Sequence, residues 1–475
     1  MAISSTGVGS GLDVNSIVTQ LMALEQRPLT LLQTKASTIQ TKISAFGSLK
    51  SQLSSLDTVA TRLGDPANWN PLTTSSTDTA TVSASASATA SAGSYAVEVT
   101  QLAQAQALSS STFASSSTVV GTGQLMLELG TTAAGVFTPK TGVLPKLITI
   151  DSSNQTLGGI RDAINASGAG VTASIVTSGG ASRLVLRSPT GADSSMRLTV
   201  TDADGNSTDT TGLSALAWNP AAAVGAGRNM SQTQAALDAN YSLNGLQLTS
   251  ATNSPADVVN GLTLKFNKLT TVPVEVGISI DSAGLRKNIN DFVTAYNGVN
   301  TLMKSQTAAD PSGGKNGALQ SDFTARSLLG ALSDTLHGSV SGLGTAASLN
   351  AVGIELQRDG SLLVNDSRLT PLLATPDKLA KLFSQPQSGS DVNSRGIGVR
   401  FKQWTDALTS DTGIIASRTQ GLTASITNNN KSQDAVQTRL TATEARLRKQ
   451  YQTLDKQMSN LNAQLAQLKS SLGLA

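Results

Sequence analysis

The sequence has no cysteine among its 475 residues, only one histidine, and few aromatic or charged side chains. The absence of cysteine excludes disulfide frameworks, zinc–thiolate sites and thiol nucleophiles. A lone His337 cannot form a histidine metal cluster, and it makes a Ser-His-Asp triad improbable. Because aromatic residues make up only 3% of the chain, its cores must be built mainly from aliphatic side chains. These absences argue against an enzyme, and no cofactor is expected.

Long hydrophobic runs are also missing. No apolar run approaches eighteen residues, so no membrane insertion is expected. No basic residue precedes Arg27 and no continuous apolar stretch follows it, which argues against a secretory signal and predicts a cytoplasmic chain or one exported by another route. The net charge is +3, with basic ends and a mildly acidic middle, and the basic residues are not interleaved with aromatics. Nucleic acid is therefore not an expected partner.

Two short motifs resemble binding loops without meeting their requirements. Residues 313–316 read Gly-Gly-Lys-Asn, but a phosphate loop needs Ser or Thr after the lysine. The Asp-rich turn over residues 202–209 lacks the bidentate glutamate that ends a calcium loop. A solvated turn is the favoured interpretation of the second motif.

What is present in abundance is helical periodicity at both ends of the chain. Asp13 can cap a helix whose apolar residues recur every three or four positions, interrupted at Pro28 and ended by Gly64-Asp65-Pro66. Residues 431–472 contain neither glycine nor proline. The predicted oligomerisation or docking seam, with its 3-4 spacing, consists of Ile17, Leu21, Leu24, Leu440, Leu447, Tyr451, Leu454, Met458, Leu461, Leu465, Leu468 and Leu472.

The middle of the chain changes to short alternating stretches separated by Gly, Asn, Asp and Ser. Such alternation predicts half-buried strands. Residues 73–94 are small and nearly uncharged, and are either a linker or a strand. One helix is expected at 156–166. The predicted strands are Tyr95–Val99, Gln124–Leu129, Leu147–Ile150, Val171–Val176, Leu184–Leu186, Leu198–Val200, Leu246–Leu248, Leu262–Phe266 and Val274–Ile280.

From residue 281 the helical period returns. Further helices are expected at 318–338, 376–384 and 397–410, and a hairpin at 354–364. The apolar face of the first helix after residue 281 predicts a leg-domain core of Leu285, Ile289, Phe292, Val293 and Tyr296.

The predicted fold class is α+β and multidomain, with long coiled-coil-like terminal helices flanking an inserted β-rich head of two lobes. The expected parts are an N-terminal export and leg arm (1–45), flexible to helical; a discontinuous helical leg domain (46–72 and 281–429); a first head lobe (73–127 and 237–280); a second head lobe (128–236); and a C-terminal coiled-coil arm (430–475).

The C-terminal arm cannot be a stable helix alone. Ordering its backbone costs on the order of 50 kcal/mol, whereas burying its apolar seam would return on the order of 20 kcal/mol, with a further contribution from helical hydrogen bonds. The arm is therefore expected to pack against another helix, either in the same chain or in a neighbour.

Several stretches resemble the flagellar hook-associated protein 2 family, the filament cap, over essentially the whole chain. They are Ile3–Leu29, Gly93–Gln106, Thr156–Val176, Tyr241–Phe266 and Val274–Asn300, the last with a Phe-Val-x-x-Tyr-Asn motif. By resemblance, the hook IN motif of flagellar axial proteins lies at Tyr241–Phe266, within the first head lobe.

The resemblance implies a filament-capping function without covalent chemistry. Copies would form a ring at the filament tip, a pentamer with species variation, that prevents loss of exported flagellin and promotes its folding and polymerisation. Flagellin, hook–filament junction proteins and a flagellar export chaperone on the C-terminal helix would be the other partners. Export would use the flagellar type III apparatus and place the protein outside the cell.

Two other functions stay open from the residues alone. A Ser- and Thr-rich β head exposed at a filament tip could act as a surface adhesin for host glycans or mucin. A flagellin or junction protein would instead lie along the filament or at its base.

Overall fold

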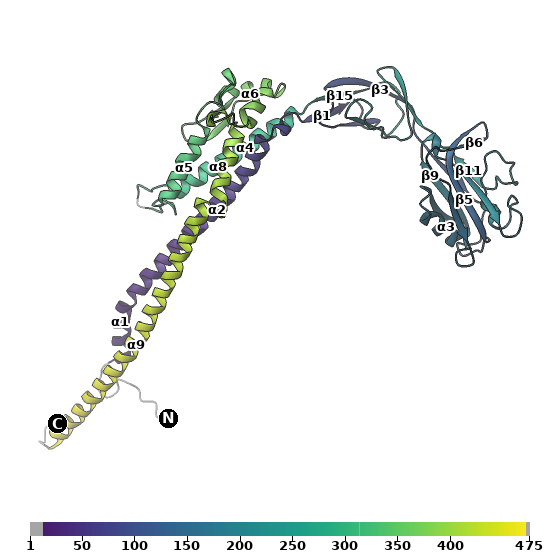
Figure 1. Ribbon diagram of the computed structural model, residues 1–475. Helices are drawn as coiled ribbons and strands as arrows, with labels where there is room; N and C mark the ends of the chain where they lie inside the picture. Colours follow the sequence, from purple (N-terminus) through teal and green to yellow (C-terminus); the bar gives the residue numbers. More distant parts are fainter. Residues whose placement is uncertain (1–12, 313, 472–475) are drawn as a thin grey trace. The chain divides into compact units, whose positions relative to one another are not determined.

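The structure, a computed structural model, describes residues 13–312 and 314–471. The chain divides into two compact units. The first combines the two ends, up to Trp69 and from Ser282 onward, and the second comprises Asn70–Asp281. Helices dominate the first unit and strands the second (Figure 1). Terminal helices thus flank an inserted β-rich region, which is the predicted fold class.

The first unit is organised around two long helices that lie side by side, α2 (Arg27–Gly64) and α9 (Ile414–Ser471) (Figure 1). A short helix, α1 (Val14–Glu25), precedes α2 and also lies against α9. The break between α1 and α2 falls at Gln26, because Pro28 is accommodated in the first turn of α2, where it removes no helical hydrogen bond. Helix α2 ends at Gly64, as expected, because Asp65 is extended.

Shorter elements pack around one end of these long helices. They are α4 (Ser282–Thr307), α5 (Phe323–Leu336), α6 (Asp366–Leu373), α7 (Asp377–Ser384) and α8 (Ile397–Thr409). The predicted hairpin is present as β16 (Ile354–Leu356) paired with β17 (Leu362–Val364). Since α2 and α9 are continuous across residues 45–46 and 429–430, the predicted boundaries between arms and leg domain are not breaks in secondary structure.

The second unit contains two hydrophobic cores. The first lies under a five-stranded sheet of order β1-β15-β3-β12-β13 and a two-stranded sheet of β14 and β2. The strands are β1 (Leu72–Ser76), β2 (Val82–Ala86), β3 (Gly93–Gln101), β12 (Ala239–Leu243), β13 (Leu246–Ser250), β14 (Leu262–Phe266) and β15 (Val274–Ile280). Residues 73–94 therefore include strand, which decides between the two interpretations of that stretch.

The second core lies between two four-stranded sheets and α3 (Leu157–Ala166). In one sheet β5 pairs with β10 on one side and with β6 and β7 on the other; the order of the other sheet is β11-β4-β9-β8. Their bounds are β4 (Ala105–Ser109), β5 (Gly123–Ala133), β6 (Val136–Pro139), β7 (Lys146–Ile150), β8 (Thr172–Ser178), β9 (Ala181–Thr190), β10 (Ser195–Asp202) and β11 (Ser231–Gln234).

One stretch that the sequence assigned to the first lobe packs in the second core instead. The sequence placed residues up to 127 in the first lobe, yet Leu108, Leu125 and Leu127 are buried in the second core. Alternation identifies the inward-facing residues of a strand but not the sheet that the strand joins, which depends on pairing with distant residues. Strand β5 joins the second core because it pairs antiparallel with β10 along the whole of β10.

Candidate functional site

The seam on α9 is covered along only part of its length. Leu440 is buried, and Leu447 and Tyr451 are half-buried against α1. Beyond Tyr451, Met458 is half-buried, whereas the exposed fractions of the leucines are 42% at Leu454, 52% at Leu461, 53% at Leu465 and 58% at Leu468. Leu472 lies outside the described residues. Within the described chain, the last turns of α9 therefore present an apolar stripe with nothing packed over it.

On α1, the predicted seam residues are not the ones that pack against α9. Ile17 and Leu21 are only half-buried and Leu24 is 56% exposed. The buried residues are Val14, Val18 and Met22, which pack against Leu440. They recur every four positions, beginning one residue after the N-terminal cap Asp13, and this spacing is visible in the sequence.

Polar contacts fix the position of α1 on α9. The Arg448 guanidinium donates a hydrogen bond to the Asn15 side-chain oxygen at 3.0 Å and forms an ion pair with Glu444 on its own helix. Asn15 and Arg448 are 433 positions apart in sequence. The two ends of the chain thus form an intramolecular pair up to Tyr451, and the remainder of α9 has no partner helix within the described chain.

The predicted leg-domain core is buried as a set. Leu285, Ile289, Phe292, Val293 and Tyr296 all project from α4 and are at most 8% exposed. They meet the few aromatic side chains of the chain: the ring of Phe292 lies edge-on to Phe383 and Phe401, with centroids 6.0 and 5.3 Å apart. Tyr296 contacts Phe401 at 5.9 Å. Four of the chain's few aromatic side chains thus gather where the helices of the leg domain meet.

Asn297, the last residue of the Phe-Val-x-x-Tyr-Asn motif, joins the hairpin to α4. Its side-chain amide donates to the Leu362 carbonyl at 2.8 Å, and its oxygen accepts from the Leu362 amide N–H at 2.7 Å. This reciprocal pair imitates a strand partner for β17. The motif therefore combines three core side chains with one polar clamp, which explains its spacing in structural terms.

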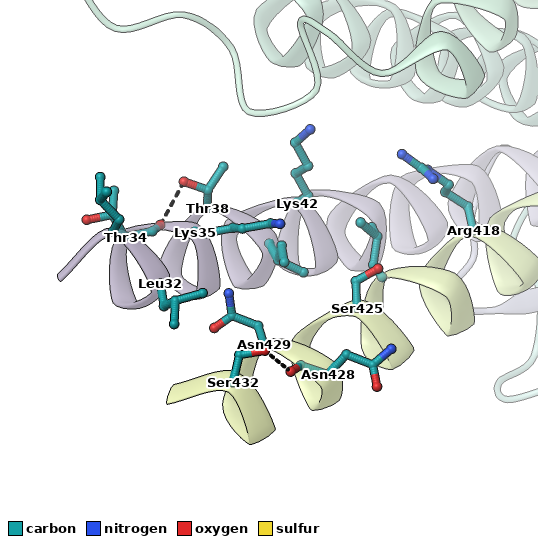
Figure 2. A pocket seen from close by; sticks show the side chains of 13 residues that line it. Leu32, Thr34, Lys35, Thr38, Lys42, Arg418, Ser425, Asn428, Asn429 and Ser432 are labelled. Atoms are coloured by element: carbon teal, nitrogen blue, oxygen red, sulfur yellow. Dashed lines mark hydrogen bonds between the residues drawn. The ribbon is translucent and has the colours of Figure 1, made fainter. Parts of the chain in front are cut away.

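A groove runs between α2 and α9. On α9 it precedes, in the sequence, the part that packs against α1. It has a volume of about 710 Å³ and is lined by α2 residues from Leu31 to Lys42 and α9 residues from Arg418 to Ser432 (Figure 2). Arg418 forms an ion pair with Asp322, whose side chain is fully buried and also caps α5. No sequence pattern identified this groove, because it depends on how the two helices are paired.

The remaining chemical candidates have structural partners. The ring of His337 is exposed at the end of α5, where Nδ1 lies 2.7 Å from the Ser333 carbonyl. Asp202, expected to be solvated, is buried instead, and its carboxylate accepts from the backbone N–H and hydroxyl of Ser214 at 2.8 and 3.0 Å. No metal-binding group of three His, Cys, Asp or Glu residues occurs in the described chain, and none of its described helices is long and apolar enough to span a bilayer.

Comparison with known families gives three matches along the chain. The family profiles described as the N-terminus and C-terminus of flagellar hook-associated protein 2 match residues 10–106 and 236–463. The flagellin hook IN motif matches residues 140–190. Its predicted placement at Tyr241–Phe266 is therefore wrong: the motif covers β7, α3, β8 and β9. Both regions contain a tight hairpin with a glycine turn, at Gly179–Gly180 and Asn244–Gly245, so this feature could not discriminate between them.

Individual relatives cover nearly the whole chain. The B-type flagellar hook-associated protein 2 of Pseudomonas aeruginosa is 31% identical over 465 residues, which cover 95% of this chain and 93% of the relative. The flagellar hook-associated protein 2 of Escherichia coli strain K12 is 32% identical over 460 residues, which cover 95% and 94%.

Among solved structures, the D1-D2-D3 domains of the flagellar cap protein FliD from Escherichia coli match with a TM-score of 0.60 and 30% identity, over 80% of this chain and 99% of that one. These comparisons give no support to the adhesin interpretation. The chain belongs to the flagellar hook-associated protein 2 family, the family of the flagellar filament cap.

Proposed function

We propose that copies of this chain assemble into a ring at the tip of a bacterial flagellar filament, where the ring retains exported flagellin and promotes its folding and polymerisation. The observation that carries this proposal is the uncovered stripe Leu454–Leu468 on a helix that the same chain covers only as far as Tyr451. Exposed apolar seams at heptad spacing are typical of helices that pack against other molecules.

The proposal assigns a role to each part of the chain. The paired helices α1, α2 and α9 would form a leg, α4 to α8 would stiffen it, and the β-rich unit would form the head of the ring. We place the boundary between the two head lobes after Ala103, which packs in the first core, and before Ala105, where β4 begins, and we place the return near Leu237.

The partners follow from this location. They are other copies of the chain in a ring, a pentamer in the simplest case with variation between species, together with flagellin, hook–filament junction proteins and an export chaperone bound to the C-terminal helix. The chain would leave the cell through the flagellar type III apparatus. Its function would be mechanical, since confinement and docking of subunits need no bond to be made or broken, and no catalytic role is proposed.

A deletion strain tests the proposal. Without the chain, cells are expected to release unpolymerised flagellin into the medium and to carry few or no filaments, and the wild-type gene on a plasmid should restore both. Immunogold labelling of complemented cells should mark filament tips. Label along the filaments or at their base, or normal filaments in the deletion strain, would contradict a capping function.

Electron microscopy of the purified protein tests the assembly directly. Closed rings of one defined subunit number are expected at high protein concentration. A protein that stays monomeric in the microscope and in sedimentation experiments would argue against self-assembly, while the deletion phenotype would still report on capping.

A further inference from the structure

The groove between α2 and α9 has an apolar floor and an exposed apolar rim. Ile39 from α2 and Leu422 from α9 are buried at its base, and Leu32 from α2 lines it and is half-buried. At the edge of the groove, Leu31 is 71% exposed. An apolar strip of this kind between two helices is the usual receptor for the apolar face of a third helix.

The charged side chains that line the groove, Lys35, Lys42 and Arg418, are all basic. Residues 27–50 and 414–433 contain six basic side chains and no acidic one. On α2 the basic residues recur every seven or eight positions, which keeps them close to one face of the helix. The Arg418 charge is compensated by Asp322, but no ion pair within the described chain includes the other five cations: Arg27, Lys35, Lys42, Lys50 and Lys431.

A buried donor lies in the same groove. Asn429 is 5% exposed, its side-chain oxygen accepts from Gln433, and its side-chain nitrogen has no acceptor within the described residues. Figure 2 shows the Asn429 amide extending from α9 toward α2, in the space beside Leu32 and Lys35. Since buried donors in native structures nearly always have an acceptor, this nitrogen marks a position where a bound molecule can supply an oxygen.

The charge also decides between occupants. Residues 1–12 of this chain carry no charged side chain, and the arm of a second copy, residues 431–475, carries seven basic and three acidic residues. Neither complements a cationic groove. An occupant with carboxylates beside an apolar stripe complements both the floor and the lysines, and its oxygens can accept from Asn429.

We propose that this groove is a docking site for an acidic amphipathic helix of another protein. The inference rests on the function proposed above, under which flagellin is the candidate source of that helix. Lys35 and Lys42 would provide the electrostatic attraction, and Leu31, Leu32 and Leu422 would provide the apolar contact.

Site-specific photocrosslinking in cells that export flagellin identifies the occupant. With the photoreactive amino acid p-benzoylphenylalanine in place of Leu31, irradiation should yield an adduct of this chain with flagellin, and mass spectrometry should locate it in a helical segment that contains Asp or Glu. The same substitution at Ser55, exposed on α2 but outside the groove, is the matched control and should yield no such adduct.

Charge reversal tests the recognition itself. The double variant Lys35→Glu with Lys42→Glu should lower the yield of the Leu31 adduct about tenfold or more, because it replaces attraction by repulsion. Lys265→Glu with Lys268→Glu changes the net charge equally at exposed positions of the β-rich unit and should leave the yield unchanged.

Three results would overturn the inference: an adduct with a second copy, an adduct with an export chaperone, or an adduct with flagellin that survives charge reversal at full yield. The capping function is judged separately, from tip labelling and from flagellin in the medium. A strain that caps its filaments normally while giving one of these three results would disprove the groove proposal and leave the cap intact.

Discussion

Two leucine stripes of similar spacing have opposite environments in this molecule. On α2, Leu49, Leu53 and Leu56 are at most 1% exposed, because α4, α8 and α9 pack around them. On the last turns of α9, Leu461, Leu465 and Leu468 are more than half exposed. The same sequence pattern thus stabilises the fold of one chain in the first case and remains available to other molecules in the second. Periodicity identifies a stripe, whereas the neighbouring elements decide what covers it.

Charges placed on the exposed stripe of α9 test most directly whether this stripe binds another molecule. The triple variant Leu454→Asp, Leu461→Asp and Leu468→Asp should abolish motility, because three carboxylates cannot be buried against a partner helix. The fold should survive, since these side chains contact little in the isolated chain. Swimming in soft agar measures the first effect, and circular dichroism with thermal unfolding measures the second.

A matched variant separates position from charge. The matched triple variant carries Gln452→Asp, Ser459→Asp and Ala466→Asp. It adds the same charge, but each substitution lies two positions before a leucine of the stripe and therefore roughly on the opposite face of α9. Motility should be largely preserved. Normal swimming of the first variant, or equal loss in both, would show that the stripe Leu454–Leu468 is not a docking surface.

The buried stripe should respond in the opposite way. Leu56→Ala should lower the free energy of unfolding of the helical unit by about 2–5 kcal/mol, because it leaves a cavity that the packed helices cannot fill. Leu465→Ala should change that free energy by less than about 0.5 kcal/mol. Chemical denaturation followed by the helical signal compares the two. Similar losses would mean that α9 is covered along its whole length in the free protein.

A smaller effect is expected at the clamp that holds the hairpin. Asn297→Ala removes both hydrogen bonds to Leu362 and should destabilise the helical unit by about 1–3 kcal/mol. Asn290→Ala, on an exposed turn of the same helix, should be nearly neutral. Loss of hydrogen-exchange protection at β16 and β17 in the first variant alone would place the effect at the hairpin, and equal protection in both would contradict this role of the motif.

Features that depend on local patterns could be predicted from the sequence. The helix end at Gly64, the hairpin around Arg358-Asp359-Gly360 and the buried face of α4 all follow from neighbouring residues. The choice between two stripes on α1 could not be made, because Val14–Val18–Met22 and Ile17–Leu21–Leu24 both fit the helical period. Only the register of α1 on α9 selects the first.

Pairings between distant residues are the other feature that could not be predicted from the sequence. Leu125 and Leu127 read as inward-facing strand residues, but nothing local shows that β5 pairs with β10 rather than with a strand of the first lobe. The groove between α2 and α9 has the same origin. Lys35, Asn429 and Leu31 are unremarkable in the sequence, and they form a surface only because two helices nearly 400 positions apart lie side by side.

The smallest expected effect concerns Tyr296 in the buried aromatic cluster. Burial raises the pKa of this phenol from the ordinary value of 10.0 to about 12, because the protein interior disfavours the charged phenolate. In the unfolded chain the phenol ionises near pH 10, whereas in the fold it keeps its proton up to about pH 12. Its contribution to stability is therefore fully present below pH 10 and is lost as the pH rises from 10 to about 12.

Tyr296→Phe removes the titrating group and keeps the ring against Phe401. The free energy of unfolding of this variant should fall less steeply between pH 10 and 12 than that of the wild type, while the two proteins should show the same pH dependence below pH 9. Lysine and arginine side chains titrate equally in both, so that the difference between the two curves isolates the phenol. Parallel curves up to pH 12 would mean that the Tyr296 phenol is solvated in the native state. The aromatic cluster on α4 would then be open to water, and its contrast with the exposed stripe on α9 would disappear.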